Sequence, residues 1–132
     1  MSVSDWISKK RPDRKVQGLA ACLLPFEQDG AMAESAFRDA VGRTEAAGLG
    51  CAVNMDTGYA NYIEAVERTA VLRWTTETLG RGTFFAAEAF VEGKEGDLVE
   101  LYRRKMDEIA AFGGTPVIFH GPASTTGNRH GL

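Results

Sequence analysis

Several features that mark other classes of protein are scarce in this chain of 132 residues. No apolar run approaches the roughly 20 residues that a membrane-spanning helix requires. The net charge is only −3, so the composition gives no general attraction to nucleic acid or to a membrane surface. The first residues lack the apolar core of a secretory signal, which predicts a cytoplasmic location. We therefore expect one soluble domain with neither a membrane nor a nucleic-acid partner.

Cysteine is also rare, with two residues in the whole chain. Cys22 and Cys51 both lie in apolar runs that are typical of buried strands. Thiols in a reducing compartment stay reduced, and neither cysteine has a basic neighbour in sequence that would activate it as a nucleophile. The sequence predicts two buried thiols and no disulfide.

Motifs for metals and phosphates are missing as well. There is no glycine-rich phosphate loop of the nucleotide-binding types. His120 and His130 could join acidic residues such as Asp56 in a metal site, but nothing has the tight spacing of a metal motif. No metal and no cofactor are expected.

The chain does contain a regular alternation of apolar strands and helical patterns. Strands are predicted at 18–26, 48–54, 83–91 and 115–120, and helices at about 33–47, 62–79 and 97–112. Gly48 is expected to end the first helix with a positive φ, and Asp97, three residues before Glu100, to cap the last one. The order β-α-β-α-β-α-β predicts an α/β fold with about four parallel strands and three helices.

Polar segments flank this pattern. Residues 1–17 form a polar, basic N-terminal arm, residues 18–120 the folded part, and residues 121–132 a polar C-terminal tail. The basic residues of the arm are Lys9, Lys10, Arg11, Arg14 and Lys15. Because no aromatic residues are interleaved with them, a solvated arm is expected and not a nucleic-acid patch.

The loop at 54–59 is the strongest candidate for a binding site. It follows a short apolar strand and precedes a helical pattern. Backbone N–H groups and the hydroxyl of Thr57 at a helix N-terminus can bind a small carboxylate. Sites in α/β proteins are commonly built at the carboxyl ends of strands. An ordinary strand-to-helix turn explains the same residues.

Four short motifs, taken in order, resemble the N-terminal half of the dihydrodipicolinate synthase / N-acetylneuraminate lyase family. They are Leu24-Pro25-Phe26, Asp29-Gly30, Thr57-Gly58 and Glu67-Arg68. In that family the first strand ends in Thr-Pro-Phe before an Asp-Gly turn. The second strand ends in Gly-Thr-Thr-Gly-Glu, and its helix carries a Glu-Arg pair. The spacing agrees across residues 18–91. The resemblance implies a partial (β/α)8 TIM barrel and the chemistry of a class I aldolase.

The resemblance also implies roles for the loop residues. Thr57 and Gly58 would offer N–H groups to the carboxylate of a pyruvate-like 2-oxo acid, with Tyr59 in the place of an acid. Asp56 would occupy the position of a threonine that relays protons, so Asp56 and Thr57 are the catalytic candidates. An aspartate there would repel the carboxylate of the substrate unless it were protonated or paired.

Glu88 is a further candidate for substrate binding. It stands near the end of the third predicted strand, where the family often has glycine. It would be a second acid at the same mouth, or a residue paired with an arginine such as Arg81. The strand-four tyrosine of the family has no clear counterpart, although Phe119 and His120 fall near its place.

The lysine of the family has no match. Class I aldolases of this type form a Schiff base through a lysine on the sixth strand. Lys94 and Lys105 are expected to be surface residues. The resemblance therefore implies an aldolase-type lyase present as a truncated N-terminal half, inactive alone. The alternative is a non-catalytic half-barrel that binds a small anion or assembles with a partner chain.

A half-barrel would have two open strand edges, at 18–26 and 115–120. Apolar side chains meant for a barrel interior would stay uncovered there. We expect copies of the chain to form a homo-oligomer through these edges, or the strands to repack as a flatter, doubly wound sheet. The large aromatic residues are expected in the core, and these are Trp74, Phe84, Phe85 and Phe90.

Overall fold

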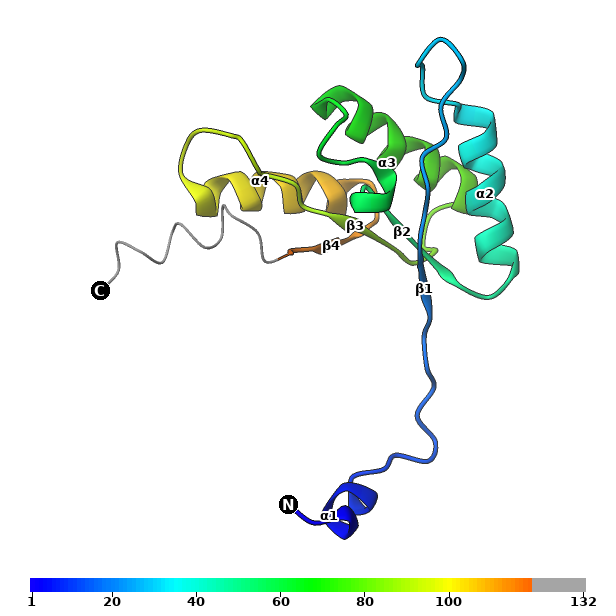
Figure 1. Ribbon diagram of the computed structural model, residues 1–132, viewed down its shortest axis with the longest axis vertical. Coiled ribbons are helices and arrows are strands. Elements are labelled where there is room, and N and C mark those ends of the chain that lie inside the picture. Colours follow the sequence, from blue (N-terminus) through cyan, green and yellow to red (C-terminus); the bar gives the residue numbers. More distant parts are fainter. Residues whose placement is uncertain (120–132) are drawn as a thin grey trace.

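The computed structural model describes residues 1–119, and its centre is a four-stranded parallel sheet (Figure 1). The strands are β1 (Leu19–Ala21), β2 (Gly50–Val53), β3 (Phe85–Glu88) and β4 (Thr115–Val117). They lie side by side in chain order and are joined by α2 (Glu34–Ala46), α3 (Ala65–Leu79) and α4 (Leu98–Ala111). The predicted α/β fold with four parallel strands is confirmed. The predicted tail at 121–132, His120 and His130 lie outside the described residues.

All three connecting helices lie on one face of the sheet, and the opposite face is bare (Figure 1). Val53 and Phe85 belong to the main core with the helices, whereas Ala52 and Ala86 form a separate small cluster with Met55 on the other side. A doubly wound sheet would carry helices on both faces. The arrangement is therefore that of a partial (β/α)8 barrel, with the bare face as its inner wall.

The core lies between the sheet and the helices. Phe37 of α2 packs against Trp74 of α3, with ring centroids 6.1 Å apart, and Phe85 and Ile109 are also almost fully buried. Burial of each such side chain stabilises the fold by about 1.5–3 kcal/mol. Trp74 and Phe85 are core residues as predicted. Phe84 is not, because it is 39% exposed.

The strands are shorter than the apolar runs that predicted them. β1 ends at Ala21, and one further ladder bond joins the N–H of Cys22 to the carbonyl of Ala52 at 2.8 Å. The chain then turns away, because a proline at position 25 has no N–H to donate to a ladder. Phe26 instead forms an antiparallel bridge with Met32 across the turn.

Helix ends follow local sequence signals. The carboxylate of Asp97 accepts the N–H of Glu100 at 3.0 Å, which confirms the predicted cap of α4. Gly48 has a φ of 81° after the end of α2, as predicted. Val66 is one of the apolar residues in the helical pattern at 62–79, but it is 70% exposed. The helix begins at Ala65, after a separate loop, and its buried apolar residues are Val71, Leu72 and Trp74.

The N-terminal arm carries one element that the sequence pattern did not predict. This is the short helix α1 (Val3–Ser8), which projects away from the sheet (Figure 1). Its first turn is closed by a capping box, in which Ser2 accepts the N–H of Asp5 and Asp5 accepts the N–H of Ser2. Every residue of the arm is exposed, as a solvated segment would be.

Two further sequence predictions can be compared with the structure. Cys22 and Cys51 are both buried and unoxidised, as expected for core thiols. Among residues 1–119, no helix has the length and apolar character needed to cross a membrane.

Candidate functional site

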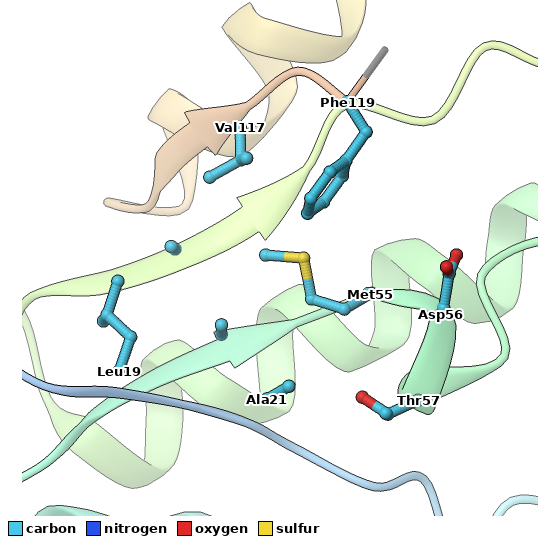
Figure 2. Close-up of a pocket in the computed structure, with 9 residues that line it drawn as sticks. Leu19, Ala21, Met55, Asp56, Thr57, Val117 and Phe119 are labelled. Atoms are coloured by element: carbon cyan, nitrogen blue, oxygen red, sulfur yellow. The ribbon is translucent and has the colours of Figure 1, made fainter. Parts of the chain in front are cut away.

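A hollow of about 380 Å³ opens on the bare face of the sheet (Figure 2). Its lining residues are Leu19, Ala21, Ala52, Met55, Asp56, Thr57, Ala86, Val117 and Phe119. Alanines on the first three strands leave room above the sheet. Asp56 and Thr57 supply the polar side chains at one end (Figure 2). The hollow thus has an apolar floor and a polar end at the carboxyl side of β2, where barrel enzymes build their sites.

The loop after β2 forms a separate 3₁₀ turn, η1 (Asp56–Gly58), and not the first turn of α3. Within this turn the N–H of Gly58 donates to the carbonyl of Met55 at 2.9 Å. The first N–H groups of a helical turn have no partner inside it. The amides of Asp56 and Thr57 are therefore the ones that a ligand could use, and the amide of Gly58 is already engaged.

Gly58 and Tyr59 shape the turn but do not line the hollow. A Cβ on Gly58 would lie 3.5 Å from the carbonyl oxygen of Cys22, so this residue faces β1. Tyr59 has a left-handed backbone with a φ of 57°, and its ring packs edge-on against Phe26 with centroids 5.7 Å apart. Asp56 and Thr57 are thus the members of the predicted set that reach the hollow.

The Glu67-Arg68 motif holds the segment between η1 and α3 in place through hydrogen bonds to its backbone. The carboxylate of Glu67 accepts the N–H of Glu64 at 2.7 Å. The guanidinium of Arg68 donates to the carbonyls of Ala60 and Ile63 at 2.7 and 2.5 Å. The N-terminus of α3, which is its positive end, is therefore occupied by the side chain of Glu67. This helix begins at Ala65, several residues after the loop at 54–59 that was predicted to precede it directly.

Glu88 ends β3, and it pairs in the sheet with Val117, which lines the hollow. The Oε2 atom of Glu88 is buried with no partner among the described residues. Burial raises the pKa of Glu88 to about 7, the negative charges of Asp56 and Glu92 add to this, and Arg68 opposes it. The expected alternative of a pairing with Arg81 is wrong. Arg81 precedes β3, at the opposite end of the sheet, where it lines another hollow.

Asn54 belongs to the predicted loop and Arg68 to the Glu67-Arg68 motif, but no role was predicted for either side chain. Asn54 is 3% exposed and has a positive φ of 53°, a conformation that is uncommon outside glycine and clusters at functional sites. Its Nδ2 donates to the carbonyl of Arg68 at 3.1 Å. The sequence signal for Asn54 is an asparagine directly after a strand, and the signal for Arg68 is the Glu67-Arg68 motif.

None of the five lysines of the chain lines the hollow. Lys94 is exposed in the turn before α4, as predicted. Lys105 is more buried than predicted, because its side chain is only 15% exposed and pairs with Glu108 at 2.5 Å. Among residues 1–119, no group of three or more His, Cys, Asp or Glu side chains could hold a metal ion.

The one-sided helices and the hollow at the strand ends define a segment of a (β/α)8 barrel. Solved dihydrodipicolinate synthases share this fold. The match to the enzyme of Rhodopseudomonas palustris (TM-score 0.65, 18% identity) covers 79% of this chain and 33% of the length of that enzyme. The match to the enzyme of Bacillus clausii (TM-score 0.64, 16% identity) covers 77% of this chain and 33% of that enzyme. The match to the N-acetylneuraminate lyase of Fusobacterium nucleatum (TM-score 0.58, 17% identity) covers 83% of this chain and 38% of that lyase.

The chain thus spans about a third of the length of these solved structures. The resemblance found in the sequence motifs is confirmed for the fold. No family model and no curated protein matches the sequence.

Proposed function

We propose that this chain contributes the substrate-binding part of an aldolase-type lyase that acts on a pyruvate-like 2-oxo acid. The hollow carries this proposal, since it combines an apolar floor with one polar end in a fold shared with such enzymes. The short carbon skeleton of the ligand would lie over Ala52 and Ala86. Its carboxylate would accept hydrogen bonds from Thr57 and from the amides of Asp56 and Thr57. The cytoplasmic location predicted above belongs to the same proposal.

The charges around the hollow weaken the binding of an anion at neutral pH. Asp56 lines the hollow and Glu88 lies beside it, whereas the guanidinium of Arg68 is engaged by backbone carbonyls. The pKa of Glu88 is raised to about 7, so its charge is lost as the pH falls below that value. We therefore expect pyruvate to bind more tightly at pH 6 than at pH 8.

The chemical step requires an amine that attacks the carbonyl of the substrate. Because no lysine of this chain reaches the hollow, we expect the 132 residues alone to bind pyruvate without forming an imine. Incubation with pyruvate and borohydride, followed by intact mass, should show no added mass. A stoichiometric adduct on Lys94 or Lys105 would contradict this expectation.

Titration with pyruvate, followed by NMR of the backbone amides, tests the binding site. The shifts should concentrate on residues 54–60. Asp56→Thr removes the opposing charge and supplies the family's residue, so it should strengthen binding. Asp39→Thr is the matched control, because Asp39 is exposed on α2 and its loss changes the net charge equally. Shifts confined to other regions, or equal effects of the two variants, would refute the assignment.

A second candidate function is favoured by the exposed apolar face. Large side chains there, including Leu19 and Phe119, are about half exposed. This supports a non-catalytic half-barrel that assembles with a partner chain or with copies of itself. Sedimentation of the chain at micromolar concentration separates the two candidates, because a compact monomer that binds pyruvate would exclude the second.

A further inference from the structure

Three buried side-chain atoms at one end of the sheet have no hydrogen-bond partner within the described part of the chain. They are Asn54 Oδ1, Arg68 Nε and Glu88 Oε2. Leaving a buried polar group unpaired destabilises the folded state, because the group loses its hydration without gaining a hydrogen bond. Native proteins have few such groups, and an ordered water molecule or an ion is a common partner for those that remain.

The three residues are neighbours. The register of β2 and β3 pairs the residues directly before Asn54 and Glu88, so these two stand at the same level on adjacent strands. The Nδ2 of Asn54 donates a hydrogen bond to the backbone carbonyl of Arg68. The positive charge of Arg68 lowers the pKa of Glu88, so these two side chains are also close. The guanidinium of Arg68 lies 4.8 Å from the ring centre of Phe90, two residues beyond Glu88.

The unpaired atoms are chemically complementary to one kind of ligand. Arg68 Nε–H can only donate, whereas Asn54 Oδ1 and an ionised Glu88 can only accept. A direct bond between Arg68 and Glu88 would leave Asn54 unsatisfied. An ammonium group could not accept from Arg68, and an anion could not donate to the two oxygens. Water accepts one bond and donates two, and buried waters typically make about three bonds to groups of this kind.

We propose that Asn54, Arg68 and Glu88 hold one buried water molecule, and that Glu88 exchanges protons with the hollow through it. With Glu88 ionised, the water accepts from Arg68 and donates to both oxygens. With Glu88 protonated, the water turns to accept from both Glu88 and Arg68 and still donates to Asn54. On ionisation, the proton leaves Oε2 for the water, which releases one of its own protons to the solvent of the hollow.

The surroundings of Glu88 allow both protonation states near neutral pH. Asp56 from η1 and Glu92 after β3 favour the protonated form, together with burial, and Arg68 from α3 favours the ionised form. Tyr102 of α4 feels the charge of Glu88, but burial raises its pKa further, so it stays neutral. This site does not depend on the substrate proposed above, because water and protons are its only ligands.

NMR of the isotope-labelled chain tests the site directly. A long-lived water should give a cross-peak to the Nε–H of Arg68. The side-chain carbon of Glu88 should titrate near pH 7, against about 4.3 for an ordinary glutamate. The Nε shift of Arg68 should follow the same midpoint, and Glu88→Gln should remove that pH dependence.

Glu95→Gln serves as the control, because Glu95 is exposed in the turn before α4 and its removal should leave the titration of Arg68 unchanged. The wild-type measurements need no variant, so a poorly folded mutant cannot hide the answer. A coupling that joins Arg68 directly to the carboxylate of Glu88, without a water cross-peak, would overturn the proposal. An ordinary midpoint for Glu88 would overturn it as well.

Discussion

The covered and bare faces of the sheet are built from different side chains. The covered face buries large groups such as Val53 and Phe85 against three helices. The bare face has alanines at its centre and exposed large residues toward its edges, with Leu19 48% and Phe119 52% exposed. One face therefore supplies most of the stability of the fold. The other is available for ligands or for another chain, and its surface can change without loss of the core.

The largest effect should come from truncating a ring on the covered face. Phe37→Ala leaves a cavity beside Trp74, so we expect a loss of about 3–5 kcal/mol in the free energy of unfolding. Phe119→Ala on the bare face should change it by about 0.5 kcal/mol or less. Urea unfolding at submicromolar concentration compares the two. Similar losses would show that the two faces do not divide stability in this way.

Self-association should depend on the bare face. Phe119→Asp places a charge on its exposed apolar surface, so we expect association to weaken at least tenfold, or by about 1.4 kcal/mol. Val66→Asp adds the same charge on the outer side of α3, where the residue is already 70% exposed, and should have no effect. Sedimentation over a range of concentrations measures both. Equal behaviour of the two variants would place the interface elsewhere.

The end of the bare face should also give stability a pH dependence. The pKa of Glu88 is raised to about 7 in the folded chain, against about 4.3 when unfolded. The folded state therefore binds the proton more tightly, and stability falls as the pH rises from about 4.3 through 7. At pH 8, Glu88→Gln should be more stable than wild type by about 1 kcal/mol, allowing for screening at this partly exposed group.

That advantage should shrink toward pH 5, as urea unfolding at both pH values can show. Glu95→Gln, whose carboxylate is exposed, should differ little from wild type at either pH. An advantage of Glu88→Gln that did not change with pH would point to packing and not to the charge.

The smallest effect is expected at the outer surface of the covering helices. Arg38 of α2 pairs with Glu77 of α3 at 2.5 Å, and both side chains are partly exposed. Glu77→Gln should cost only about 0.2–1 kcal/mol, because exposed ion pairs gain little over hydration. The difference should fade in 1 M salt, where charges are screened within about 3 Å. A salt-independent loss of several kcal/mol would mean that this pair, and not the core, joins the two helices.

The order of elements could be predicted from the sequence, because apolar periodicity and end signals such as Gly48 and Asp97 are local. Strand lengths could not, because a strand ends where its neighbour ceases to pair with it. The run 18–26 is apolar throughout, yet pairing stops near Cys22. The buried side of α3 could not be predicted from its apolar residues alone either, because Val66 is apolar and yet exposed.

The candidate site could be predicted only in part, because some of its residues are placed by local sequence and others by tertiary contacts. Asp56 and Thr57 follow a strand directly, so their position at its carboxyl end could be predicted from the order of residues alone. The polar surroundings of Glu88 could not, because Arg68 comes from α3 and Asn54 has a left-handed backbone. Arg81 is nearer to Glu88 in sequence than Arg68, but a strand separates them and carries Arg81 to the other end of the sheet.

The identical order of the strands in the sheet and in the chain bears on how the fold is made. Each pairing joins segments about 30 residues apart, and within residues 1–119 no strand inserts between two earlier ones. Parallel pairings over such separations must close a loop before they form, so they form more slowly than the local contacts of a helical protein. During synthesis, each strand can add to the edge left by the one before it as it leaves the ribosome. The sheet can therefore grow in one direction, from N-terminus to C-terminus, without undoing a pairing already made.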